Sequence, residues 1–122
     1  MTATIDLTCN RGDTAIWTIT ASEGGFALDL TGARVIMCAR RNWASPILFE
    51  RTSDANGGIV IDPDQVANRG KATVTLKVND TLQLENDTLE LVYTMHVVIS
   101  GNSFTIAEGK LTMSPVAWDG VT

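Results

Sequence analysis

Few side chains in this sequence have a type and spacing that could do chemistry. His96 is the sole histidine, and no cysteine, histidine or carboxylate stands at a metal-like spacing from it. The sequence contains no nucleophile elbow, glycine-rich phosphate loop, CxxC pair or HExxH motif. We therefore predict a solvent-facing or interfacial role for His96, and no catalytic residue, cofactor or bound metal.

Several short motifs are better explained as turns than as sites. Asp62 and Asp64 could offer oxygen ligands to calcium, but a calcium site needs about six oxygens, so a capped turn is the preferred interpretation. The tripeptide Arg11-Gly12-Asp13 matches an integrin-binding motif, and segments 79–81 and 86–88 match the glycosylation pattern. Each is also ordinary turn chemistry, because glycine, asparagine and aspartate favour turns.

Aromatic residues outside the regular strand pattern are stronger candidates for function. Trp17 is in phase with a strand, which predicts a place in the core, whereas Trp43 lies in a loop and Trp118 in the C-terminal tail. Tryptophan in loops and tails is favoured in protein interfaces and in sugar stacking, and packing against the domain itself is the alternative for both. The residues predicted to make interface contacts are Arg40, Arg41, Trp43, His96 and Trp118.

Length and composition fit one globular domain over residues 1–122, with 116–122 as an extended tail. The net charge is −5, and Arg40-Arg41 is the one basic cluster. Because binding to a phosphate backbone needs clustered lysine and arginine, we do not expect a nucleic acid partner. Neither a membrane-length apolar run nor a signal peptide is present, so we expect synthesis in a cytoplasm, with Cys9 and Cys38 as reduced thiols rather than a disulfide.

Alternation of apolar and polar residues predicts about eight short strands and no long helix. Successive side chains on a strand point to opposite faces, so a period of two marks one buried face. Short, regularly spaced strands are typical of an antiparallel β-sandwich, and the strand at 34–40, apolar on both faces, is expected inside its sheet. The predicted extended segments are 2–9, 15–21, 26–32, 34–40, 47–51, 59–61, 71–78, 89–99 and 104–113.

The last two of these segments predict a long C-terminal β-hairpin. A two-residue turn at Gly101-Asn102 would pair Ile99 with Phe104, but the same register would then bury Glu108 at a cost of several kcal/mol. One inserted residue near Gly109 repairs the pattern, so we predict a β-bulge at Glu108-Gly109.

The outward side of the strand at 89–99 is more apolar than a solvated face requires. It carries Val92, His96 and Val98. We expect a neighbouring loop or another subunit to cover it.

A series of short segments, in this order, resembles a known family. The segments are Gly12-Asp13-Thr14 at the start of a strand, 28–33, 58–61, 70–76 and the final hairpin. Together they resemble the Ig-like β-sandwich at the N-terminus of tailed-phage baseplate upper proteins and related tail-fibre proteins, over about residues 5–116. The resemblance implies an Ig-like fold, partners among other virion proteins, a homo-oligomer with a trimer favoured, and a place in a virion assembled in a bacterial cytoplasm.

The leading hypothesis is a non-enzymatic structural protein of a tailed-phage virion. It would be a baseplate or tail-fibre adaptor or a decoration protein, acting through oligomerisation and docking. The alternative is a carbohydrate-binding module that contributes to host-surface attachment, with Trp43 as the stacking platform. Packing of Trp43 and Trp118 against another chain would favour assembly, whereas an open aromatic surface beside aspartate or asparagine would favour a glycan.

Overall fold

Strands form all of the regular secondary structure in the described part of the computed structural model of this chain. The structure describes residues 3–10, 14–23, 25–76 and 89–114, and within these ranges it contains no helix, hence none suited to crossing a membrane. The predicted all-β class is confirmed. The strands are β1 (Ala3–Thr4), β2 (Leu7–Asn10), β3 (Ala15–Thr20), β4 (Ser22–Glu23), β5 (Phe26–Ala27), β6 (Arg34–Arg40), β7 (Ile47–Thr52), β8 (Ile59–Ile61), β9 (Lys71–Leu76), β10 (Leu89–Ile99) and β11 (Asn102–Ser114).

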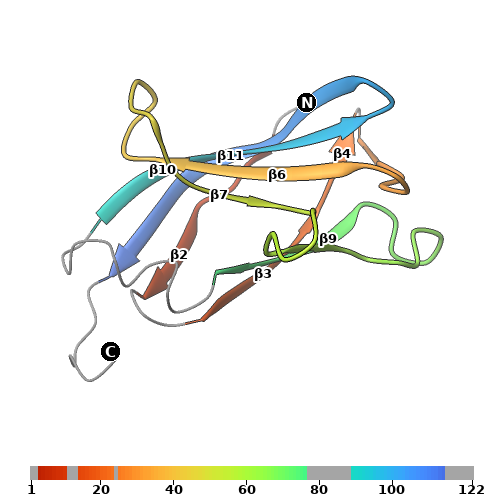
Figure 1. The fold of residues 1–122 in the computed structure, drawn as a ribbon, viewed down its shortest axis with the longest axis horizontal. Helices are drawn as coiled ribbons and strands as arrows, with labels where there is room; N and C mark the ends of the chain where they lie inside the picture. The colour runs from red at the N-terminus through yellow and green to blue at the C-terminus, as the bar shows by residue number, and fades with distance from the viewer. Residues whose placement is uncertain (1–2, 11–13, 24, 77–88, 115–122) are drawn as a thin grey trace.

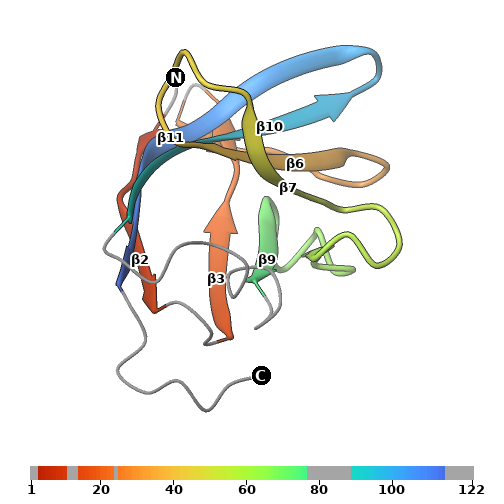
Figure 2. The ribbon, with the colours of Figure 1, turned by 60° about the vertical axis from the view of Figure 1, so that its left-hand side comes forward.

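The strands are arranged in two layers (Figures 1 and 2). The larger sheet has the order β1-β11-β10-β6-β7, with β2 also paired to β11, and the smaller sheet has the order β3-β9-β8. β4 and β5 form a separate two-stranded ribbon. In both views β6, β7, β10 and β11 lie on one side of the molecule and β3 and β9 on the other.

The core lies between the layers and is built from the alternating positions that the sequence marks as apolar. From β10 it takes Leu91, Tyr93, Met95 and Val97, all nearly inaccessible to water, and both sheets contribute to one cluster. Burial of each such side chain stabilises the fold by roughly 1.5–3 kcal/mol relative to exposure. Trp17 packs against this cluster while half-buried, in agreement with its predicted place.

Strand β6 occupies the interior position that its apolar pattern predicts. It pairs with β10 on one side and β7 on the other, both antiparallel. Its inward residues Val35, Met37 and Ala39 are fully buried, and the outward Cys38 is also buried. No disulfide joins Cys38 to Cys9 on β2, so both are thiols as predicted.

The turn between β10 and β11 lies one residue earlier than predicted. Ser100 and Gly101 both have positive φ, of 50° and 81°, which is the requirement of a type I′ turn. Ile99 therefore faces Asn102, and not Phe104 as predicted. Because the pairing moves by two residues, the same side chains stay on the inner face although their predicted partners are wrong.

The register does shift within this strand pair, but not at the predicted place. Met95 faces Ala107 and His96 faces Thr105, which makes Ile106 the extra residue. The predicted bulge at Glu108-Gly109 is thus wrong by about two residues. With the earlier turn and the shift at Ile106, Ile106 and Ala107 are both buried, and Glu108 lies on the outer face opposite Thr94.

The predicted first strand, 2–9, is interrupted in the structure. β1 and β2 both run parallel to β11, at Ala107–Glu108 and Leu111–Ser114 respectively. Ile5 and Asp6 lie between them outside the regular ladder. This interruption at the sheet edge helps to build the site described next.

Candidate binding site around Trp43

The loop between β6 and β7 places Trp43 above the outer face of the larger sheet. In Figure 1 this loop, drawn in gold, projects from the sheet on the side away from β3 and β9. Its shape is set locally: the Asn42 side chain accepts a hydrogen bond from the Ala44 N–H (3.0 Å) and the Asn42 carbonyl accepts one from the Ser45 N–H (3.1 Å). Arg40 donates from Nη1 to the Ser45 carbonyl at 3.0 Å, so this predicted interface residue braces the loop.

The edge strand is held in its interrupted course by three contacts around Ile5 and Asp6. The Ile5 N–H donates to the Glu108 carbonyl at 2.9 Å, and the buried Tyr93 hydroxyl donates to the Ile5 carbonyl at 2.6 Å. Asp6 Oδ1 accepts the Lys110 N–H at 3.1 Å, so a side chain replaces a backbone carbonyl in the ladder. The position of the Asp6 carboxylate is therefore set by the sheet itself.

Gly109 permits this close approach of the edge chain. A Cβ on Gly109 would collide with the carbonyl group of Ile5 and would lie 3.1 Å from Asp6 Oδ1. The glycine that suggested a bulge in the sequence is thus required for a different reason, the crossing of another segment. Its φ does not lie in the left-handed region.

These parts enclose an open hollow of about 330 Å³ on the outer face of the larger sheet. Trp43, 56% exposed, is its aromatic wall. The remaining lining combines an apolar residue, two carboxylates, a hydroxyl and an ammonium group. Besides Trp43 and the backbone at Gly109, it consists of Thr4, Asp6, Val92, Glu108 and Lys110.

The charges around the hollow are mixed and partly compensated. Lys110 Nζ lies 2.9 Å from Glu90 Oε1, and this hydrogen bond is the main reason why the pKa of Lys110 is raised. Burial, with a smaller contribution from the Asp6 carboxylate, raises the pKa of Tyr93 to about 12. The Tyr93 hydroxyl therefore stays protonated and can act as a donor to Ile5 at neutral pH.

His96 lies on the same outer face, beyond the hollow. Its ring is half-buried between two threonines, with Nε2 3.1 Å from Thr94 Oγ1 and Nδ1 3.1 Å from Thr105 Oγ1. Val92 and Val98 are half-buried as well, and Val92 forms part of the hollow next to Trp43. The loop that carries Trp43 thus lies beside one end of this face, at Val92.

Of the other predicted contact residues, only Arg41 is described. It is exposed in the loop that carries Trp43. Trp118, the Arg11-Gly12-Asp13 tripeptide and the two glycosylation-like segments lie outside the described residues. The structure therefore brings Arg40, Arg41 and Trp43 together, with His96 on the same sheet face.

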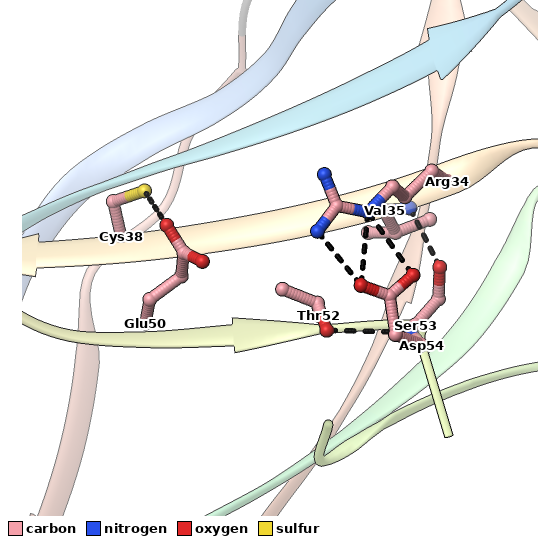
Figure 3. Close-up of polar contacts among 7 residues, drawn as sticks. All are labelled: Arg34, Val35, Cys38, Glu50, Thr52, Ser53 and Asp54. Atoms are coloured by element: carbon pink, nitrogen blue, oxygen red, sulfur yellow. Dashed lines mark hydrogen bonds and ion pairs between the residues drawn. The ribbon is translucent and has the colours of Figure 1, made fainter. Parts of the chain in front are cut away.

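The outer face of β6 and β7 carries two further polar contacts, shown in Figure 3. Arg34 forms a two-pronged ion pair with Asp54, with Nη2 to Oδ2 at 2.7 Å, and this hydrogen bond lowers the pKa of Asp54. Cys38 Sγ lies 3.6 Å from Glu50 Oε2. Burial, reinforced by the Glu50 charge, raises the pKa of this thiol, which makes it a poor nucleophile.

Asp62 and Asp64 act as turn formers. Asp62 Oδ1 accepts the Asp64 N–H at 2.8 Å, and Asp64 Oδ1 accepts the N–H groups of Val66 and Ala67. These contacts agree with the capped turn preferred from the sequence. Across the described ranges, no three His, Cys, Asp or Glu side chains gather as a metal site would require.

A second, larger hollow of about 600 Å³ lies beside the connection between β7 and β8. Small residues and backbone form most of its lining, including Gly57 and Gly58, with Asp54 as its one charged side chain. That carboxylate is already held by Arg34. The hollow presents no set of convergent polar groups comparable with that around Trp43.

Sequence reasoning identified Trp43 but missed the carboxylates beside it. Asp6 and Glu108 are far from Trp43 along the chain, and no local motif connects them. The sequence offered an indirect signal for Glu108 alone, which lies where the alternation changes phase before Gly109; the alternation through Asp6 is regular. Only the pairing of the edge chain with β11 brings them together.

Comparison with known proteins assigns no function to this site. The sequence matches no protein-family model and no curated protein. The residues and their arrangement are therefore the basis for assigning a function.

Proposed function

We propose that this chain is a non-enzymatic, Ig-like structural module of a tailed-phage virion. The strand order supports the Ig-like assignment. In variable-type Ig domains one sheet has neighbours G, F, C and C′ and the other has B, E and D. The orders β11-β10-β6-β7 and β3-β9-β8 fit this scheme, and β2 takes the place of a first strand paired with strand G.

The phage assignment rests on the sequence resemblance, whose segments fall at identifiable strands of the structure. Segment 28–33 leads into β6, segment 58–61 contains β8 and segment 70–76 contains β9. The proposed roles are a baseplate or tail-fibre adaptor or a decoration protein, with other virion proteins and further copies of the chain as partners.

A non-enzymatic role is supported by the surroundings of the two best candidate reactive groups. The His96 ring is held between threonine hydroxyls, and the buried Cys38 thiol has a raised pKa. The threonine hydroxyls lie within reach of His96, but among the described residues no carboxylate contacts the ring to complete a nucleophile, base and orienting group.

The observation that carries oligomerisation is the nearly uncharged outer face of the smaller sheet. Ile16 on β3 and Val60 on β8 are 63% and 67% exposed. Between and beside them the outward positions are threonines, and Lys71 is the one charged side chain among the outward positions of these strands. The outward threonines are Thr18, Thr20, Thr73 and Thr75.

We assign a second copy of the chain as the partner of this face. With a net charge of −5, two copies repel each other wherever carboxylates meet. A face of threonine, isoleucine and valine avoids that repulsion, and its two exposed apolar side chains can be buried by contact. Homo-oligomers, with the trimer favoured, would form through this face and leave the larger sheet accessible.

The experiment is a solution mass measurement on the wild type and two variants. We expect the wild type to give three times the chain mass of 13.1 kDa. The double variant Ile16→Lys, Val60→Lys should shift the mass toward a single chain, because lysines would then face one another across the interface. Val66→Lys is the matched control, since Val66 is 96% exposed and lies outside the sheet.

A wild type that keeps the mass of one chain at every concentration would sink the oligomer proposal. Equal masses for wild type and double variant would sink the assignment of the face. Detection of the chain by mass spectrometry in purified phage particles, made by the host that encodes it, tests the virion assignment separately.

A further inference from the structure

The hollow beside Trp43 combines the groups that recognise a sugar ring. A pyranose has an apolar C–H face and a rim of hydroxyls that both donate and accept hydrogen bonds. The half-exposed indole of Trp43 offers a flat stacking surface, and Val92 adds a second apolar contact. Asp6 and Glu108 can accept hydrogen bonds from hydroxyls, and Thr4 can donate.

The carboxylate of Asp6 is oriented before any ligand arrives. Its Oδ1 accepts the Lys110 backbone N–H at 3.1 Å, which fixes the side chain against the sheet. A carboxylate has about four lone-pair sites on its two oxygens, so capacity for ligand hydroxyls remains. Arg40 in turn braces the Trp43 loop through the Ser45 carbonyl. Both walls of the hollow are therefore preorganised, which reduces the entropy lost on binding.

Size and charge argue against other ligands. A volume of about 330 Å³ is at the lower end for small-molecule sites and suits one sugar ring, not a peptide segment. Phosphates and other anions would meet Asp6 and Glu108, whereas Lys110 is already paired with Glu90. A small cation is the remaining competitor, because carboxylates beside an aromatic ring also attract ammonium groups.

We propose that this hollow is a binding site for a neutral pyranose, such as the terminal unit of a surface glycan, with Trp43 as the stacking platform and Asp6 and Glu108 as hydroxyl acceptors. This goes beyond the proposed structural role and uses the opposite face of the molecule. Attachment to a glycan and self-association through the smaller sheet can therefore occur together.

The test is an NMR titration of the ¹⁵N-labelled chain with glucose, galactose, mannose and N-acetylglucosamine in turn, and with choline as the cation probe. At least one pyranose should shift the Trp43 indole signal and the amides of Asp6 and Lys110 in a saturable way. Trp43→Ala should weaken this binding by about tenfold or more, which is the usual contribution of an aromatic stacking partner.

Two variants provide the controls. Phe26→Ala removes another aromatic side chain, 78% exposed on β5, and should leave binding unchanged. Trp43→Phe keeps a smaller aromatic surface and should bind with intermediate affinity. The amide spectra of all variants report folding independently of the ligand.

Three results would overturn the proposal. They are the absence of saturable shifts with all four pyranoses, shifts at the hollow with choline alone, and equal pyranose affinity in Trp43→Ala and the wild type. None of these depends on the mass of the oligomer, so the test is separate from that of the structural role.

Discussion

The outer faces of the two sheets differ in kind, although the strands of both sheets alternate inward and outward side chains. The outer face of the smaller sheet is nearly uncharged, with exposed Ile16 and Val60 among threonines. The outer face of the larger sheet is charged and hollowed, and a loop and an edge strand rise over it. The outer face of the smaller sheet requires only regular strands, whereas the hollow requires an interrupted edge strand and a projecting loop. This difference agrees with the two proposals, in which the smaller sheet contacts other copies of the chain and the larger sheet binds a small ligand.

The largest expected effect is that of Gln65→Leu, which would disturb both sheets at once. Gln65 is buried and its Oε1 accepts N–H bonds from Leu30 at 2.9 Å and Gly70 at 3.0 Å, and thereby ties the approach to β6 in the larger sheet to the start of β9 in the smaller. Gln65→Leu should lower the free energy of unfolding by roughly 1–3 kcal/mol for each of these two N–H groups left unpaired. Denaturant unfolding measures this loss. A loss of less than about 1 kcal/mol in unfolding free energy would show that water satisfies the two N–H groups without penalty.

A smaller effect should be confined to the larger sheet. Gly109→Ala would place a methyl group against the Ile5 carbonyl, so the edge chain must move and the hollow with it. We expect a loss of about 1–3 kcal/mol in unfolding free energy, as for overpacking elsewhere, together with weaker pyranose binding. Thr73→Ala on the smaller sheet is the comparison and should change stability by about 0.5 kcal/mol or less. If both variants are equally stable, the close crossing at Gly109 is not required.

The smallest expected effect appears only at alkaline pH. Tyr93 is the sole tyrosine, so its ionisation can be followed directly by tyrosinate absorbance. Its pKa is raised from 10.0 to about 12, chiefly by burial, so its stabilising contribution is complete below pH 10.0 and is lost as pH rises through about 12. Absorbance should therefore titrate near pH 12 in the folded chain.

If Tyr93 titrates near the ordinary tyrosine pKa of 10.0 in the folded chain, its hydroxyl beneath the edge strand is open to water. In Tyr93→Phe the stability lost at alkaline pH should be smaller. It should not vanish, because the raised pKa of Cys38 acts in the same direction.

The alternation of apolar and polar residues was sufficient to predict which side chains of the long strands point inward. The inner face of β10, the interior place of β6 and the all-β class follow from the period of two, because burial of one face fixes which side chains point inward. The C-terminal register did not follow. Moving a two-residue turn by one position shifts the strand pairing by two residues and leaves the same side chains on the inner face. Alternation alone therefore could not choose between a turn at Gly101-Asn102 and one at Ser100-Gly101.

Tertiary structure alone decided the role of the glycine and the position of the carboxylates. From the sequence, Gly109 indicates a flexible backbone, but only the crossing of Ile5 shows that it makes room for another segment. The shift in register falls instead at Ile106, where the packing beside Met95 accepts an extra buried residue.

By itself the sequence determined an acidic, all-β domain with Trp43 as a candidate contact. Local composition carries that information, since alternation, charge and loop residues are read along the chain. The hollow was decided by the fold, because parallel pairing of the N-terminal edge with β11 places Asp6 and Glu108 beside a loop from the middle of the chain. Neighbours of this kind depend on strand order, which no single stretch of residues specifies.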